Sequence, residues 1–280
     1  MTTPRSWVSK ATRPEMAGKV QYHIRCGEGD VAPYCLLPGD PARVPLIASS
    51  WDESREVASY REHVTMTGRA GGVPITACST GAGGPSTASA LEELCELGAH
   101  TFIRVGTTAA IQPDIACGDL IITEAAVRHD GTSDQYVEPA YPAAADGEVT
   151  LALIEAAERL GVPYHVGVTC CTASFYTGQG RPGFGGYRQA SMDTLVGDLQ
   201  QARVLNFEME GSTIMVMGRL FGLRTGSVLA AIANRVTDAF EYRGVEECCR
   251  VAVEAVKILS RWDEVKRAHG KRRWFPSLGA

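Results

Sequence analysis

The segment V-L-N-F-E-M-E-G (residues 204–211) joins a short apolar run to two acidic residues, Glu208 and Glu210, on either side of Met209. The run predicts a strand, and the residues from Met209 to Leu220 predict a helix. Two carboxylates at such a junction can accept hydroxyl hydrogens while a thioether packs against an apolar ring face, which suits a small polyol such as a sugar. The same residues also suit an ordinary first helical turn, where they favour the helix dipole. Read alone, the segment leaves both interpretations open.

Strands and helices alternate along the rest of the chain, which predicts one α/β domain with a largely parallel or mixed sheet. Gly71 and Gly72 predict a hairpin between two of the strands, and Asp40 and Pro41 suit the N-cap and first turn of the first helix. The predicted strands are 31–37, 64–68, 73–79, 100–106, 119–127, 166–172 and 226–233. The predicted helices are 41–50, 85–97, 148–160, 209–220 and 245–262.

The two ends of the chain differ from its middle. Residues 1–20 are polar and unpatterned and predict a flexible N-terminal arm, whereas residues 21–265 predict the single domain. A basic run, K-R-A-H-G-K-R-R-W (266–274), opens a C-terminal tail (266–280) that we expect to be solvated. The glycine-rich stretch 178–186 predicts a loop.

Composition excludes several classes of function. The net charge of −5 gives no support to binding of nucleic acid or of anionic membranes. No window of 18 apolar residues is present, which argues against a membrane span, and the first twenty residues carry no secretory signal. Nine cysteines without a C-x-x-C motif indicate reduced thiols and a cytoplasmic protein, not a disulfide framework or a zinc site.

Two glycine-bearing loops precede predicted helices. In L-P-G-D-P-A-R (37–43), Gly39 allows close backbone approach and Arg43 follows one turn later, as an oxyanion requires, although an ordinary turn with a surface arginine also fits. S-T-G-A-G-G-P-S (79–86) is not a dinucleotide fingerprint, because Ser86 stands at the sixth position and no acidic residue follows about twenty positions on. It also lacks the Lys-Ser/Thr of a P-loop. A tight turn able to touch a ligand or a neighbouring chain remains.

The buried strand F-I-R-V-G-T-T (102–108) contains Arg104. A buried guanidinium is costly unless a fixed anion faces it, so a ligand role for Arg104 is as well supported as a structural ion pair. Thr107 and Thr108 add hydroxyls at the carboxyl end of the strand, where ligands gather in α/β sheets.

The loop S-F-Y-T-G-Q-G-R (174–181) offers a flat ring at Phe175, a donor and an acceptor at Gln179, and parallel donors at Arg181. Together these groups complement the carbonyl–NH–carbonyl edge of an oxopyrimidine. In isolation, a flexible surface loop is the simpler interpretation.

Taken in order, these motifs resemble the nucleoside phosphorylase family, and within it the uridine phosphorylase branch. The matching stretches are L-P-G-D-P-A-R-V, C-S-T-G-A-G-G-P-S, F-I-R-V-G-T-T-A-A-I-Q, T-A-S-F-Y-T-G-Q-G-R, N-F-E-M-E-G and A-N-R, from about His23 to Arg235. The resemblance implies a single-domain, three-layer fold whose mixed, partly barrel-like sheet is flanked by helices.

The resemblance also implies a role for each matching residue. Arg104, Glu210 and Arg181 are the implied catalytic residues. The implied phosphate site is Gly39, Arg43, Arg104, Thr107 and, from a neighbouring subunit, Arg61 in S-Y-R-E-H. The implied ribose site is Glu208, Met209, Glu210 and a neighbour's His23. The implied base site is Thr108, Phe175, Gln179, Arg181, Ile232 and Arg235. Glu62, the Ala82 carbonyl and Ser86 match a potassium site at the dimer interface.

The implied reaction is phosphorolysis of uridine, extending to deoxyuridine and thymidine, to uracil and the pentose 1-phosphate by a pentosyltransferase of pyrimidine salvage. Inorganic phosphate is the co-substrate, and no organic cofactor is implied. Dimers complete each site and assemble into a hexamer. Ala109 and Gly211 depart from the usual family residues, and Ala109 is expected to affect substrate preference. Purine cleavage stays open because Asp238 is close to the place of the purine-specific aspartate, and a non-catalytic nucleoside-binding protein is the other alternative. Replacing Arg104 by alanine is expected to abolish cleavage and leave the fold largely assembled.

Overall fold

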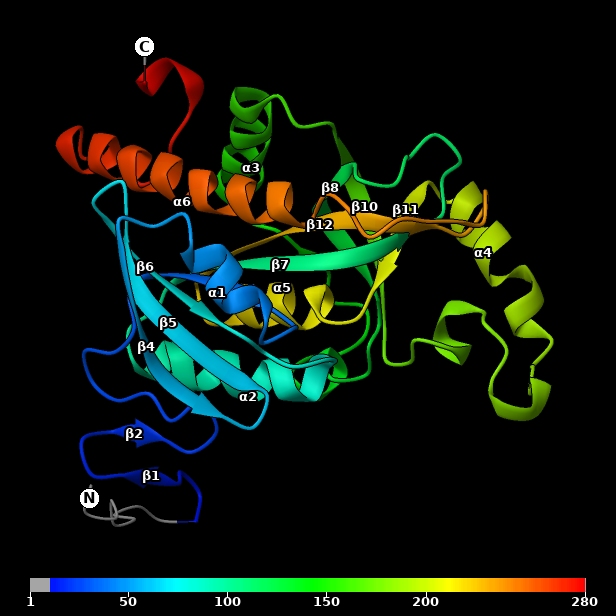
Figure 1. Cartoon of the computed structure of the whole chain (residues 1–280), viewed down its shortest axis with the longest axis horizontal. Helices are drawn as coiled ribbons and strands as arrows, with labels where there is room; N and C mark the ends of the chain where they lie inside the picture. The colour runs from blue at the N-terminus through cyan, green and yellow to red at the C-terminus, as the bar shows by residue number, and fades with distance from the viewer. Residues whose placement is uncertain (1–10, 280) are drawn as a thin grey trace.

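The computed structural model describes residues 11–279 and has the three layers that the sequence predicts: helices, a mixed sheet, and helices again (Figure 1). Within the described residues, eleven strands form the main sheet. Five of them close on themselves into a small barrel, because β12 pairs with β8 on one side and with β7 on the other. The barrel strands, in spatial order, are β12 (Arg224–Asn234), β8 (Leu120–His129), β10 (Tyr164–Thr172), β11 (Val204–Glu208) and β7 (Thr101–Ala110).

The sheet continues from the barrel as an open extension. Strand β3 (Tyr34–Pro38) runs parallel to β7 and to β6 (Val73–Cys78). Strands β6 and β5 (His63–Ala70) form the hairpin predicted around Gly71 and Gly72, and β4 (Glu53–Tyr60) completes the edge. Short strands β9 (Ala143–Ala144) and β13 (Ala239–Phe240) pair with β8 and β12.

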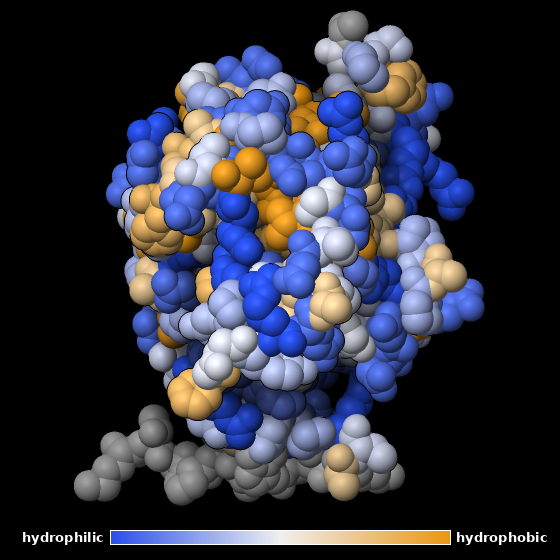
Figure 2. Space-filling view, turned by 90° about the vertical axis from the view of Figure 1, so that its right-hand side faces the viewer, coloured by the Kyte–Doolittle hydropathy of each residue, from blue (hydrophilic) through white to orange (hydrophobic). Residues whose placement is uncertain are grey.

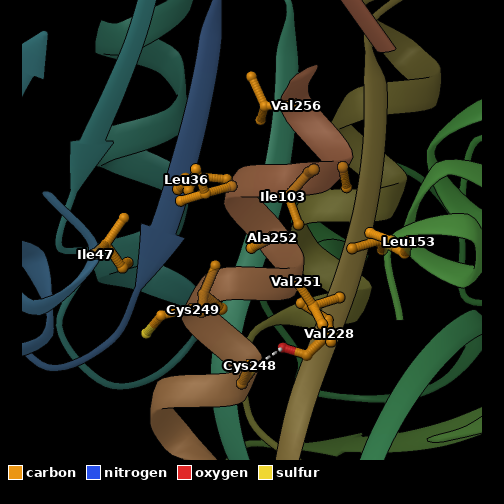
Figure 3. Packing of buried hydrophobic residues seen from close by; sticks show 14 of the residues in the cluster. Leu36, Ile47, Ile103, Leu153, Val228, Cys248, Cys249, Val251, Ala252 and Val256 are labelled. Carbon is orange, nitrogen blue, oxygen red and sulfur yellow. Dashed lines mark hydrogen bonds between the residues drawn. The ribbon is translucent and has the colours of Figure 1, made fainter. Parts of the chain in front are cut away.

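The helices cover both faces of the sheet (Figure 1). On one face, α1 (Arg43–Ala48), α3 (Gly147–Leu160) and α6 (Val245–Ala268) pack on the strands through the largest apolar cluster. Figure 3 shows Val251 of α6 beside Val228 of β12, and Val256 of α6 and Ile103 of β7 belong to the same cluster. On the other face, α2 (Gly84–Glu96) and α5 (Gly211–Leu220) share a second cluster. Full burial of such side chains stabilises by about 1.5–3 kcal/mol each, so the two clusters fix the strands that carry the site.

Two helices begin later than the sequence predicts. The first starts at Arg43, not at Pro41, because Asp40 and Pro41 belong to a hydrogen-bonded turn in which the Asp40 carboxylate accepts from the N–H of Ala42. Helix α5 starts at Gly211, because Glu208 still belongs to β11. Strand β4 and α4 (Ser191–Gln201) were not predicted, since both present mainly exposed or half-exposed side chains and lack a clear apolar pattern.

Both chain ends contain ordered contacts. The first ten residues of the predicted arm lie outside the described residues, and β1 (Glu15–Met16) pairs with β2 (Val20–Gln21) in a separate two-stranded sheet. At the other end, α6 extends to Ala268, and the ring of Trp274 stacks on that of Trp262 at 3.8 Å. In the described part of the chain, no helix is long and apolar enough to span a bilayer.

Candidate active site

A cavity of about 730 Å³ opens where β7, β11 and β12 end. This is the edge at which ligands bind in α/β folds. Figure 2 shows hydrophobic surface inside a hollow with a mainly hydrophilic rim on that side of the molecule. The predicted site residues that line the cavity are Gly39, Arg43, Ala82, Arg104, Thr107, Thr108, Phe175, Gln179, Arg181, Glu208, Met209, Glu210, Ile232 and Arg235.

Arg104 is the charged centre of the cavity. Its side chain comes from β7 and is only 6% exposed. The Nε atom donates to Glu208 Oε2 at 2.9 Å, and Nη2 pairs with Glu210. The third nitrogen, Nη1, has no hydrogen-bond partner within residues 11–279 and lies beside Gly39, where an added Cβ would be 3.8 Å away. A buried guanidinium nitrogen without a hydrogen-bond partner is already in place to donate to an anion.

Glu208 and Glu210 have different hydrogen-bond partners although they are only two residues apart. Both oxygens of Glu208 accept backbone N–H groups at the start of α5, from Glu210 at 2.8 Å and from Gly211 at 2.7 Å. Glu208 therefore caps the helix. Glu210 accepts from the N–H of Gly83 at 2.5 Å and pairs with Arg104, and its side chain borders the cavity.

Burial and pairing act in opposite directions on these groups. Burial raises the pKa of Glu210, the charge of Arg104 lowers it, and the neighbouring Glu208 raises it again, so the net direction is upward. Burial lowers the pKa of Arg104, but Glu210 and Glu208 outweigh it and keep the guanidinium charged. The single positive charge of Arg104 thus faces the two buried carboxylates of Glu208 and Glu210, and it cannot fully compensate both of them.

Arg43 extends the cationic end of the cavity. Its side chain is buried, and Nη1 donates to the carbonyl of Val105 at 3.1 Å. Gly39 lies against the loop at Gly81, where an added Cβ would sit 3.2 Å from the Gly81 carbonyl oxygen. The close approach keeps two loop backbones and two guanidinium groups around one small space, as the sequence predicts for an oxyanion site.

Another group of lining residues carries the pattern that the sequence predicts for binding a heterocycle. Arg181 lies over the ring of Phe175, with Cζ 4.0 Å from the ring centroid, and its Nη1 donates to Gln179 Oε1 and to the Phe175 carbonyl. Arg235 donates to the Gln179 carbonyl at 2.9 Å. Burial, with the charge of Arg235, lowers the pKa of Arg181 to about 10, so the side chain remains a cation at neutral pH.

The two threonines at the end of β7 differ. Thr107 is partly exposed and borders the cavity. The hydroxyl of Thr108 donates to the Phe207 carbonyl at 2.5 Å and accepts from Asn206 Nδ2 at 2.7 Å. Thr108 therefore ties β7 to β11, and its hydroxyl is already engaged within the chain.

His23 and Arg61 lie outside the cavity of their own chain. The backbone N–H and Nδ1 of His23 contact the carboxylate of Glu93, with 2.7 Å between Nδ1 and Oε1. Arg61 lies 5.5 Å from the ring centroid of Tyr22, and the Tyr22 and His23 rings meet edge to face. The two predicted residues thus belong to one surface patch.

Two of the three residues matched to potassium meet directly. Ser86 Oγ donates to Glu62 Oε1 at 2.8 Å and also to the carbonyl of Thr80. Hydrogen bonds that the Glu62 carboxylate accepts from its own backbone N–H and from Ser86 lower the pKa of Glu62, which stays ionised. A carboxylate, a hydroxyl and a backbone carbonyl are the oxygen ligands that hard cations take, so these residues fit such an ion.

Other lining residues have no assigned site role from the sequence, although Ala109 was expected to affect substrate preference and Asp238 to bear on purine cleavage. They are Asp40, Pro41, Gly81, Ala109, Phe207, Ala233, Asn234, Asp238, Ala239 and Phe240. Asp238 lies in the turn between β12 and β13 with a positive φ of 58°, and Ala239 and Phe240 form β13. Their position just beyond a strand that ends at the cavity was the available signal, although only Asp238 was considered for ligand contact.

Comparison with known proteins agrees with this arrangement. A family model described as the phosphorylase superfamily matches residues 33–261. The uridine phosphorylase of Thermococcus kodakarensis is 60% identical over 268 residues, which cover 96% of this chain and 97% of that protein. The uridine phosphorylase of Escherichia coli is 41% identical over 85% of this chain and 94% of its own length. A more distant relative, the guanosine phosphorylase of Halorubrum lacusprofundi, is 37% identical over 77% of this chain and 84% of its own length.

Proposed function

Since this chain belongs to the phosphorylase superfamily, we propose that it cleaves uridine with inorganic phosphate, giving uracil and ribose 1-phosphate. It is a pentosyltransferase, as its relatives named uridine phosphorylase over most of its length support. The observation that carries the proposal is Arg104, which is buried between two carboxylates and has, among the described residues, one nitrogen without a hydrogen-bond partner, next to Gly39. A cavity with this cationic end and an amide–guanidinium end can hold a phosphate and a base on either side of a sugar.

At the cationic end, Arg104 and Arg43 hold the phosphate, with Gly39 and Thr107 beside it. Fixing the nucleophile close to C1′ converts a bimolecular attack into a local one, and well-oriented reactions of this kind gain about 7–11 kcal/mol. Both arginines are buried and already anchored through other atoms, so they need little rearrangement to bind an oxyanion.

In the middle, Glu210 accepts the 2′- and 3′-hydroxyls of the ribose, and Met209 lies against the sugar. Positive charge develops on the ribose ring as the glycosidic bond weakens, and a buried carboxylate stabilises that charge more strongly than water would. Glu208 acts indirectly, by capping α5 and holding Arg104.

At the far end, Gln179 and Arg181 bind the pyrimidine edge and stabilise the negative charge that arrives on the departing uracil. Phe175, Ile232 and Arg235 border the same end. The reaction as written needs no organic cofactor, because phosphate forms the new bond to C1′ as the bond to the base breaks.

A second subunit completes each site in this proposal. His23 and Arg61 lie together on the surface, away from their own cavity, as residues donated to a neighbour would. The Glu93 carboxylate accepts from Nδ1 of His23, which leaves Nε2 to meet a ribose 5′-hydroxyl. Six subunits built from dimers is the assembly we propose. Glu62, Ser86 and the Ala82 carbonyl would hold a potassium ion near that interface.

A cytoplasmic location is also proposed, and it is supported by the cysteines. All nine are free thiols, eight of them buried. Burial raises the pKa of Cys26 to about 11, so this thiol stays protonated and unreactive near neutral pH. Free, unreactive thiols suit a reducing compartment.

The decisive experiment incubates the protein with uridine, 2′-deoxyuridine, thymidine, inosine and guanosine, each with and without phosphate, and measures the released base. We expect uracil from uridine only when phosphate is present. Release of purines alone would favour the purine reading, for which Asp238 at the cavity and the guanosine phosphorylase relative are the supporting observations. Uridine binding without release of any base would identify a non-catalytic binding protein and refute the proposal.

A further inference from the structure

A second buried carboxylate cluster lies close to the proposed ribose site but outside the cavity. Asp130 follows the end of β8 and is only 4% exposed. Its Oδ1 accepts from Ser133 Oγ and Ser212 Oγ, both at 2.7 Å. Its Oδ2 accepts from the N–H of Ser133 at 2.8 Å and from Thr213 Oγ1 at 2.7 Å. Each oxygen therefore joins the loop after β8 to the first turn of α5.

This carboxylate stays ionised within the protein. Burial raises the pKa of Asp130, but the hydrogen bonds from Ser212, Ser133 and Thr213 outweigh burial, and the net direction is downward. A negative charge beside the first turn of a helix also favours the helix dipole. The four hydrogen bonds and the charge both fix the start of α5 relative to β8.

The start of α5 is where Glu210 is held. Glu210 is the residue immediately before the helix, and Ser212 and Thr213 are its second and third residues. The backbone of Glu210 is bonded to Glu208, and its carboxylate is bonded to the N–H of Gly83. Asp130 adds to these contacts by holding Ser212 and Thr213, in the helical turn that follows Glu210.

Little room exists for α5 to move without disturbing these bonds. A Cβ added to Gly84, the first residue of α2, would lie 2.4 Å from Thr132 Oγ1 and 2.8 Å from Thr213 Oγ1. The loop after β8, the start of α2 and the start of α5 are therefore in direct contact. A shift of the first turn of α5 would change the geometry of the Gly83–Glu210 hydrogen bond.

We propose that Asp130 is a positioning residue for the cleavage reaction: through Ser212 and Thr213 it holds the Glu210 carboxylate in the orientation that accepts the ribose 2′-hydroxyl. The inference rests on the proposed function, in which Glu210 binds the sugar hydroxyls. It goes further by assigning a reaction role to a residue that touches neither substrate nor cavity.

The test replaces Asp130 by asparagine, which preserves size and removes the charge. The amide offers one acceptor oxygen in place of two, and the N–H of Ser133 cannot reverse its direction as a hydroxyl can. Asp134 is the matched control, since it lies on the same loop and pairs with Arg128 at 2.9 Å, and among the described residues it makes no hydrogen bond or ion pair with α5. Asp130→Asn and Asp134→Asn are each assayed with uridine and with 2′-deoxyuridine, which lacks the 2′-hydroxyl.

For Asp130→Asn, we expect kcat/KM for uridine to fall about tenfold to a hundredfold, mostly in kcat, because small misplacements of a reacting group have effects of this size. The fall for 2′-deoxyuridine should be several times smaller. Asp134→Asn should match the wild type with both substrates. Adding Asp130→Asn to Glu210→Gln should have less than about a twofold further effect, as expected for residues acting through one another.

Equal losses with both nucleosides, or additive losses in the double variant, would show that Asp130 is only a structural anchor and would overturn the inference. Ser212→Ala, which removes one of the four hydrogen bonds and keeps the carboxylate, decides the matter if Asp130→Asn does not fold. Ser212→Ala should also lower kcat/KM for uridine more than kcat/KM for 2′-deoxyuridine, but by a smaller factor. A ratio of the two kcat/KM values equal to that of the wild type would overturn the inference. Absence of uracil release by the wild type would defeat the proposed function itself, whereas normal wild-type turnover with an unselective Asp130→Asn would defeat this inference alone.

Discussion

Replacement of Arg104 by alanine should damage stability as well as activity. The sequence alone suggests that the fold would survive largely assembled, but in the structure one guanidinium compensates both Glu208 and Glu210. All three side chains are buried. Removing one partner of a buried ion pair costs about 3–5 kcal/mol, because it leaves a buried charge uncompensated. For a chain of this size, that loss corresponds to roughly a 10 °C lower Tm.

The penalty should depend on pH in a defined direction. The pKa of Glu210 is raised in the folded protein even with Arg104 present, and loss of Arg104 removes an effect that lowers it. A folded-state pKa above the unfolded value means that the folded state binds more protons, so stability falls as pH rises above the unfolded value of about 4.5. Arg104→Ala should therefore be close to the wild type in stability near pH 5 and should lose stability progressively toward neutral pH.

Thermal unfolding from pH 5 to pH 8 provides the assay, with phosphate-dependent uracil release measured in parallel. Turnover should fall by about a hundredfold or more, since Arg104 positions the phosphate nucleophile and a misplacement of about 1 Å can cost about a hundredfold. Arg104→Lys is the matched control: it retains a charge and most of the stability but loses the second donor and most of the activity. Adding Glu210→Gln to Arg104→Ala should recover stability. A pH-independent Tm equal to that of the wild type in Arg104→Ala would refute the reasoning, as would normal turnover.

Three further expectations follow from other parts of the structure. Gly39→Ala should raise KM for phosphate much more than KM for uridine in steady-state kinetics, because its methyl group would lie 3.8 Å from Arg104 Nη1; equal changes would contradict the placement of phosphate there. Trp274→Ala should lower the free energy of unfolding by about 2–3 kcal/mol, seen as a lower Tm in calorimetry, because the Trp274 ring stacks on Trp262 of α6. Phe275→Ala, at an exposed neighbour, should leave the Tm unchanged. Arg61→Ala and Arg104→Ala are each expected to be inactive alone. After the two variants are mixed and reassembled, part of the activity should return, because in mixed dimers some sites take an intact Arg104 from one subunit and an intact Arg61 from the other. No recovery would argue against a shared site.

The sequence predicts the cavity residues well because most of them stand at the ends of buried strands. Arg104 was conspicuous as a charge inside an apolar run, and Glu208 and Glu210 as carboxylates at a strand–helix junction. Both signals are local, and the topology then brings their strands side by side: β11 pairs with β7, and β7 with β12.

Contacts between distant segments were beyond sequence reasoning. Asp130 meets Ser212 across 82 positions of the chain, and neither residue has a distinctive neighbourhood in the sequence. The tail looked solvated because it is basic, but Trp274 packs on α6 and its backbone N–H donates to Glu148 at 3.0 Å. Strand β4 was missed for a different reason: its side chains are largely exposed, so no apolar alternation marks it.

The acidic pair at 208 and 210 is open to two interpretations from the sequence, and in the structure the two residues make different contacts. A carboxylate that caps a helix must face backbone N–H groups, and Glu208 does so with both oxygens. Both carboxylates line the cavity, but Glu210 stands just before the helix and accepts a single backbone N–H, that of Gly83. The intervening Met209 also lines the cavity. Because the chain turns from strand to helix between them, side chains two positions apart face different partners. The first glutamate makes the helix start rigid, and that rigidity gives the second one a fixed direction.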